Sequence, residues 1–210
     1  MILLPRTALL AGALALITAL AACTATPPPA QFPQVGIDAA PIRLDVGTVA
    51  IERAYQPPNA APNVDHRFPV RPLDAAVQWA ETRLVAAGVA VTTADEDPTV
   101  VARRARFIVR DASVVETSLE PIGGLKGLFT TEQSERYDAR VVVEIEIVDG
   151  AGQVVGTASA TGTRTRTVPE DITLSEREEV WFEMTEELMH ELDTQLEHTI
   201  RSVFADYVAL

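Results

Sequence analysis

The sequence predicts an α+β fold, a two-layer sandwich in which a mainly antiparallel sheet of four to five strands carries two helices on one face. Three observations predict it. Apolar and charged side chains alternate over residues 137–148, which is typical of a strand with one buried face. A glycine-containing turn at 149–152 joins this segment to residues 154–167, which predicts a hairpin. Beyond residue 175, apolar residues recur every three or four positions, which indicates a long C-terminal helix.

The segments before the hairpin predict one strand and a loop. Apolar residues alternate over 42–55, but their phase changes beside Gly47, so we expect a single strand with a β-bulge. The next segment, 56–72, contains five prolines and is expected to be a surface loop.

A shorter helix is expected after this loop. Pro72 suits the first helical position, apolar residues then recur at helical spacing through Leu84, and Gly88 supplies a stop. Residues 89–92 are expected to form a short strand, and residues 105–119 a β-rich segment whose phase slips midway.

The C-terminal helix is expected to pack closely on the hairpin. Small residues on one face of the second hairpin strand allow that approach: Gly156, Ala158, Ala160 and Gly162. Ser175 and Glu178 predict a capping box at the start of a helix of about 32 residues, which would reach roughly 48 Å. Its apolar stripe comprises Trp181, Met184, Leu188, Leu192, Leu196, Ile200, Val203 and Tyr207. The opposite face is acidic.

Charge and cysteine content exclude several classes of partner and site. The chain of 210 residues has a formal net charge of -13, and removal of residues 1–22 takes away only Arg6. A surface this acidic repels phosphate backbones, and we therefore do not expect nucleic acid as a partner. The single cysteine excludes an internal disulfide and a cysteine-based zinc site. Three arginines, Arg103, Arg104 and Arg106, are expected as edge charges that discourage strand addition.

The first 23 residues carry export and attachment signals. Arg6 precedes an apolar run from Ala8 to Leu20, which is short for a hydrocarbon core of about 30 Å and fits a signal peptide. The segment Leu20-Ala21-Ala22-Cys23 resembles the lipobox of bacterial lipoproteins. The resemblance implies cleavage before Cys23 and acyl chains on that cysteine, where two or three chains make release slow. The alternative is an ordinary secretory signal cleaved after Ala22.

These signals divide the chain into three parts. Residues 1–22 are expected to be the signal peptide, 23–41 the acylated cysteine and a proline-rich tether outside the packed core, and 42–210 a single α+β domain. Thr24 stands where the enterobacterial sorting rule has Asp for inner-membrane retention. These resemblances imply that the protein is anchored in the cell envelope and faces the periplasm, and we expect the outer membrane in preference to the inner membrane.

The residue types of catalytic and metal sites do not gather in any pattern, so we expect no enzymatic activity, no cofactor and no metal. His66 lies in the proline-rich loop, and His190 and His198 are eight residues apart on the last helix, too far to share one ion alone. No nucleophile-elbow pattern is present. The glycine-rich segment 123–127 lacks the spacing of a phosphate loop. Glu144 and Glu146 are expected on the solvated face of a strand.

One connection between strands carries more apolar residues than a solvated loop needs. In residues 119–129, LEPIGGLKGLF, four apolar side chains stand among three glycines: Ile122, Leu125, Leu128 and Phe129. We expect them either to tuck under the sheet or to contact lipid or a protein partner. The loop around Phe68, with Arg67 and Arg71 beside it, is a second candidate of the same kind.

These observations favour a membrane-anchored lipoprotein that acts by binding. The lipobox, the size and the long final helix resemble small envelope lipoproteins that assist ABC transport systems and lipopolysaccharide assembly, which implies an accessory subunit of an envelope transport or assembly complex. The alternative is a lipid-binding or lipid-shuttling lipoprotein, which requires a cavity between helices and sheet. The third class, an enzyme, requires a cleft in which histidines and carboxylates converge.

Overall fold

The computed structural model of the chain describes residues 31–88, 103–119 and 133–209. Its elements follow the order β1 (Ile42–Leu44), β2 (Thr48–Arg53), η1 (Asp65–Arg67), α1 (Pro72–Arg83), β3 (Leu84–Ala86), β4 (Arg104–Ser118), β5 (Gln133–Val148), β6 (Val154–Pro169), α2 (Leu174–Val203) and η2 (Ala205–Tyr207).

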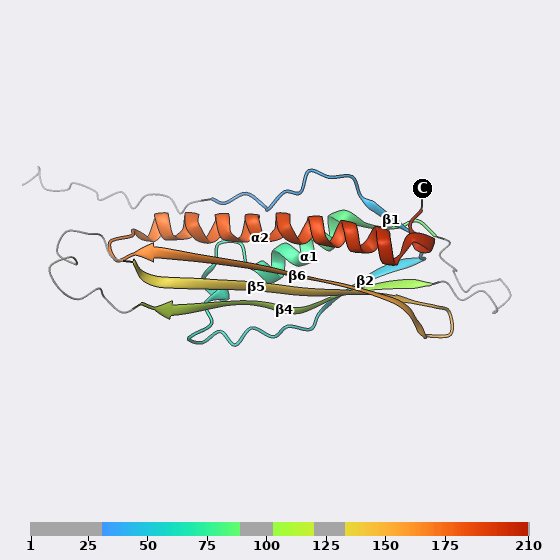
Figure 1. The fold of residues 1–210 in the computed structure, drawn as a ribbon, viewed down its shortest axis with the longest axis horizontal. Helices are drawn as coiled ribbons and strands as arrows, with labels where there is room; N and C mark the ends of the chain where they lie inside the picture. Colours follow the sequence, from blue (N-terminus) through green and yellow to red (C-terminus); the bar gives the residue numbers. More distant parts are fainter. Residues whose placement is uncertain (1–30, 89–102, 120–132, 210) are drawn as a thin grey trace, which may run out of the picture. The chain divides into compact units, whose positions relative to one another are not determined.

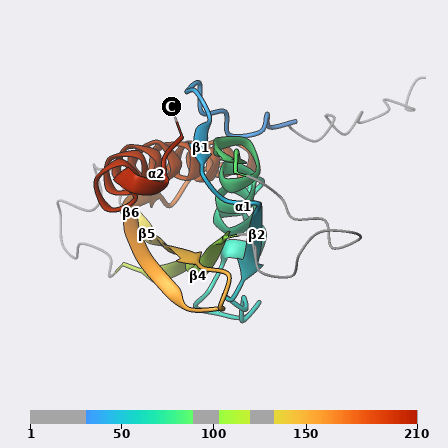
Figure 2. The same cartoon turned by 90° about the vertical axis from the view of Figure 1, so that its right-hand side faces the viewer.

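The main sheet has four strands in the order β2-β4-β5-β6. β4, β5 and β6 form an antiparallel meander, and β2 pairs parallel to β4 at the edge. A separate parallel pair joins β1 to β3. Both helices lie on one side of the main sheet, α1 towards β2 and β4 and α2 along β6 (Figure 1, Figure 2). The α+β prediction, with a mainly antiparallel sheet and a long C-terminal helix, is confirmed.

The single strand expected over 42–55 is wrong, because the chain forms two strands in different sheets. β1 pairs with β3 and β2 with β4, and the break lies at the phase change beside Gly47. There the Val46 amide turns back to donate to the Leu44 carbonyl at 2.8 Å, and the Gly47 amide donates to Arg103. The two phases of alternation thus indicate two partners, and the expected bulge is a turn.

Helix α1 begins at Pro72, as predicted, but it ends at Arg83 well before Gly88. The chain turns directly into β3, because Leu84 pairs with Ile42 of β1 and is buried there. The expected strand at 89–92 lies outside the described residues.

The three long strands match their predicted patterns. The phase slip expected within 105–119 is a register shift in β4 between Val109 and Asp111. All six expected core residues of β5 are buried: Tyr137, Ala139, Val141, Val143, Ile145 and Ile147.

The expected edge role of the arginines at 103, 104 and 106 is wrong, because β4 is an interior strand between β2 and β5. Arg106 bridges both neighbours, at 2.7 Å from Glu52 and 2.7 Å from Glu146. Arg110 binds Glu144 at 3.2 Å, which holds the pKa of that carboxyl below its usual range. Ile108 lies in register between Glu52 and Glu144 and is fully buried, although it points away from the helices. Ion pairs therefore cover part of this outer face.

The small-residue face of β6 meets α2 as predicted. A Cβ added at Gly156 would lie 3.0 Å from the Phe204 ring, and one at Gly162 would lie 3.0 Å from Leu188 Cδ1. Such contacts are tighter than ordinary van der Waals packing, so a larger residue at either position would require Phe204 or Leu188 to shift.

Helix α2 departs from the prediction at its two ends. Its stripe is buried from Trp181 to Ile200, but Val203 is 48% exposed and Phe204 fills the core position, because the last step is four residues instead of three. The capping box predicted at Ser175 and Glu178 is wrong. Thr173 accepts a hydrogen bond from the Glu176 amide, and the Glu176 carboxylate accepts one from the Thr173 amide.

The segment before β1 also departs from the prediction, because residues 32–37 pack on the helices. The Phe32 and Phe182 rings are 5.3 Å apart, Gln34 and Gln78 are hydrogen-bonded at 3.2 Å, and Val35 is only 6% exposed. Part of the tether that was expected to remain outside the core through residue 41 is therefore docked on the helices. We call residues 32–37 the strap. Its few apolar residues suffice for docking without any periodic pattern.

Replacement of Gly162 by Val tests the close approach of α2 to β6. The added methyl groups would overlap Leu188, whose side chain and carbonyl oxygen lie 3.0 and 3.3 Å from an ideal Cβ. We expect G162V to lower the free energy of unfolding in urea by about 1–3 kcal/mol, as overpacked cores do. The matched control is G36V, since nothing lies within 4 Å of a Cβ there. Equal unfolding midpoints for both variants would contradict the close approach.

Candidate functional site

The site residues expected from the sequence lie outside the described part of the chain. This holds for Cys23 and for the four apolar loop residues Ile122, Leu125, Leu128 and Phe129. The ends of that loop are described: β4 ends at Ser118, β5 begins at Gln133, and the Leu119 amide donates to the Ser134 carbonyl at 2.8 Å. The loop therefore leaves and re-enters the sheet at one point.

For the second apolar candidate, the loop around Phe68, burial is confirmed and the alternative of a contact surface is wrong. Phe68 is buried and stacks on Trp181 of α2, with 5.0 Å between the ring centroids. The two neighbouring arginines form ion pairs within the domain, Arg67 with Glu116 and Arg71 with Asp74. The aromatic ring belongs to the core, which a proline-rich context does not reveal.

The described histidines stand apart from one another. His66, His190 and His198 are all exposed, the last two on α2. Within residues 31–88, 103–119 and 133–209, no group of three His, Cys, Asp or Glu side chains is placed to hold a metal ion.

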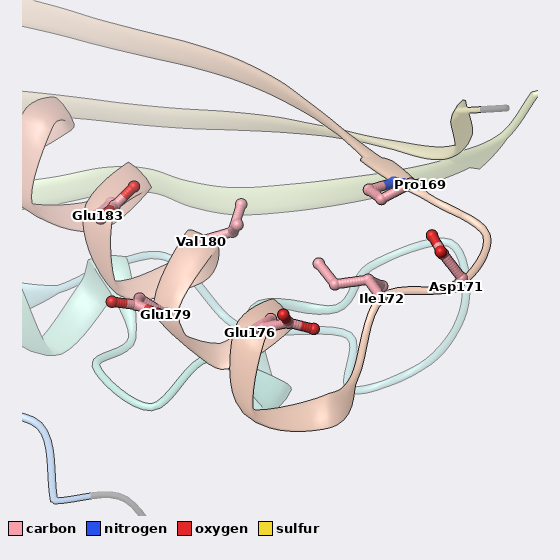
Figure 3. A pocket seen from close by; sticks show the side chains of 7 residues that line it. All are labelled: Pro169, Asp171, Ile172, Glu176, Glu179, Val180 and Glu183. Carbon is pink, nitrogen blue, oxygen red and sulfur yellow. The ribbon is translucent and has the colours of Figure 1, made fainter. Parts of the chain in front are cut away.

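A hollow of about 370 Å³ lies where the end of β6 meets the first turns of α2 (Figure 3). Carboxylates and apolar side chains line it together: Pro169, Asp171, Ile172, Glu176, Glu179, Val180 and Glu183. The sequence predicts only that one face of this helix is acidic. What it misses is the turn at 169–172, which brings apolar side chains to the same place.

The electrostatics of the hollow are dominated by its acids. Hydrogen bonds from the Thr173 hydroxyl and amide lower the pKa of Glu176 below its ordinary value. Asp171, Glu179 and Glu183 form no ion pair with any described residue. The positive end of the α2 dipole lies beside Glu176, which is in the first turn of the helix. This lining attracts cationic groups, and it offers no hydroxyl, thiol or imidazole nucleophile.

Side chains pack closely between the helices and the sheet at several described positions. Trp79 stacks on Phe107 at 5.6 Å, and Met184, Leu188 and Leu192 are fully buried along α2. Apart from this packing, the hollow at the start of α2 is a described feature that could receive another molecule.

None of the described helices combines the length and the apolar composition needed to cross a membrane.

Comparison with known proteins yields distant structural likenesses. No known family matches the sequence, and no curated protein matches it. The fold is similar to a minor lipoprotein from Acinetobacter baumannii at 15% identity, with 74% of this chain and 93% of that chain covered and a TM-score of 0.34. It is similar to the rare lipoprotein B from Shewanella oneidensis at 11% identity, with 74% and 95% covered and a TM-score of 0.37.

A protein from Xanthomonas campestris is similar at 11% identity, with 82% of this chain and 93% of that chain covered and a TM-score of 0.34. At TM-scores this low, the likenesses carry no argument about the family or the activity of this chain. The class that its own residues define is an α+β sandwich domain with an acidic hollow at one end.

Replacement of Thr173 by Ala tests the cap that shapes the hollow. T173A removes the hydroxyl that accepts the Glu176 amide bond, so we expect a loss of about 0.5–2 kcal/mol in the free energy of unfolding at neutral pH. Because the folded-state pKa of Glu176 is lowered, its contribution is present above about pH 4.5 and is lost as the pH falls through the lowered value.

The control is S175A, which removes the hydroxyl of the cap predicted from the sequence. We expect it to leave the urea midpoint nearly unchanged. A larger loss for S175A than for T173A would return the cap to Ser175.

Proposed function

We propose that this chain is a membrane-anchored lipoprotein of the cell envelope whose periplasm-facing domain acts by binding, as an accessory subunit of an envelope transport or assembly complex. One observation carries the proposal: the apolar run from Ala8 to Leu20 ends in Leu20-Ala21-Ala22-Cys23, at the position and spacing of a lipobox. Acyl chains on Cys23 would supply attachment, and the α+β domain would supply recognition.

The side chains that line the hollow support binding in preference to catalysis. Carboxylates and aliphatic side chains line it, and the only hydrogen-bonded acid among them, Glu176, is engaged in capping α2. The hydrogen bonds from Thr173 lower the pKa of Glu176, which suits attraction of cationic groups better than proton transfer near neutral pH.

The packing of the described domain favours binding at its surface over lipid shuttling. A lipid chain needs a cavity between helices and sheet, whereas Gly156 and Gly162 lie in close contact with Phe204 and Leu188 of the helix layer. We propose Ile122, Leu125, Leu128 and Phe129 as contacts for lipid or a protein partner, and the outer membrane as the favoured location on the ground of Thr24.

Replacement of Cys23 by Ser tests the attachment. C23S removes the thiol that would carry the diacylglycerol, so we expect loss of fatty-acid labelling and of recovery in the membrane fraction, measured after growth with a labelled fatty acid. The neighbouring T24S variant keeps the thiol and should label as the native chain does. Labelling that persists in C23S would refute the lipoprotein assignment.

Photo-crosslinking in intact cells tests the accessory role. A photoreactive residue at Leu125 or Leu128 should form adducts with a protein of the envelope, identified by mass spectrometry, whereas the same residue at Ala151 in the β5–β6 turn serves as the matched control. L125D should abolish the adducts formed from position 128, and it should abolish co-purification in mild detergent. Recovery of the native protein only as a lone monomer, without adducts, would contradict the role.

A further inference from the structure

The strap and the residues that follow it, up to β1, run along the helix layer from Phe182 of α2 to the residues beyond its C-terminus. Phe32 lies against Phe182, which is the ninth residue of the 30-residue helix. Twelve residues later, Leu44 forms a bridge with Val208, and the Asp45 amide donates to the Tyr207 carbonyl at 2.7 Å beyond the C-terminus of α2. The chain thus enters the described domain near the start of α2 and joins β1 near its end (Figure 1).

The docked strap limits the length of chain that is free to reach a bilayer. Nine Cα steps separate Cys23 from Phe32, and they span at most about 30 Å when extended. Measured along the helix axis, Phe182 lies about 12 Å from the start of α2 and about 32 Å from its end. With the strap docked, a short tether therefore leaves the domain near the start of α2.

Release of the strap would move this exit point to the opposite end of the helix. The first residue held by the domain would then be Ile42 in β1, with 19 Cα steps back to Cys23 and a reach of at most about 65 Å. Docking of Phe32, Gln34 and Val35 thus selects both the end from which the tether leaves and its length.

We propose that the strap orients the domain on the membrane: it holds the start of α2, with its acidic hollow, towards the bilayer that carries the acyl chains, and the β5–β6 turn away from it. This inference rests on the proposed acylation of Cys23. Gly156 next to this turn contacts Phe204, so the turn lies at the far end of α2, about 44 Å from the helix start.

The charge of the membrane-facing end determines how closely it approaches. Asp171, Glu176, Glu179 and Glu183 surround the hollow, and anionic headgroups repel them. These carboxylates therefore face the lipid surface without inserting into it. Because the repulsion extends over a Debye length of about 8–10 Å at moderate ionic strength, added salt brings the end closer.

Energy transfer from the protein to labelled headgroups tests the orientation. Full-length acylated protein is placed in vesicles of phosphatidylethanolamine and phosphatidylglycerol, with a donor on S175C or A151C and acceptors on the headgroups. In the acylated chain the introduced cysteine is the only free thiol, because Cys23 is the sole native cysteine. We expect higher transfer from position 175 than from 151, and a further rise at 175 when salt is added.

The double variant F32A/V35A should abolish the difference between the two positions, because it releases the strap. The control is G36A, a strap substitution with nothing within 4 Å of the added Cβ, which should preserve the difference. Q34A removes only the bond to Gln78 and should reduce the difference in part, with circular dichroism reporting that each variant is folded.

The outcomes separate the orientation from the anchor. Protein that does not float with the vesicles overturns the proposed acylation. Floating native protein with equal transfer from both positions, or with higher transfer from 151, overturns the orientation alone. A difference that survives in folded F32A/V35A overturns the role of the strap.

Discussion

A single buried guanidinium joins the two helices, and much of the domain depends on it. Arg83, at the end of α1, is 1% exposed and lies 2.8 Å from both Asp193 and Glu197 of α2, while the Trp79 indole donates to the same Asp193. A buried charge without partners is costly, so α1 and α2 are stable only in the register that pairs Arg83 with the two carboxylates. A hydrogen bond from Arg201, aided by Arg83, lowers the pKa of Glu197, which keeps this acid charged.

That register has consequences on both sides of Arg83. Leu84, the next residue, begins β3 and so gives β1 its partner, while α2 turns its apolar stripe onto the glycine face of β6. Periodicity predicts β5, β6 and most of α2, because these elements alternate or repeat within their own residues. The ion pair between Arg83 and Asp193 cannot be predicted from the sequence, because 110 residues separate the two side chains. The residues around Arg83 also do not distinguish it from a solvated arginine.

The same distinction applies to the features that concern function. The lipobox is contiguous, so Cys23 is recognisable from neighbouring residues alone. The hollow cannot be recognised in this way, because it forms only when the turn after β6 places Ile172 against the first turns of α2. Thr173 and Ser175 both begin a Ser/Thr-x-x-Glu pattern, and only the place where the chain leaves β6 decides between them. Strap docking likewise depends on the Phe182 ring, which lies 150 residues from Phe32.

The pairing of β1 has a consequence for the order in which the domain is completed. β1 is the first strand of the domain, yet its partners come later in the chain. Ile42 pairs with Leu84, and Leu44 pairs with Val208, which lies 164 positions further on. Loop-closure entropy rises only slowly with length, so this arrangement costs more in folding rate than in stability. The β4–β5–β6 meander pairs strands that follow one another in the chain, so we expect it to form early and β1 to pair late.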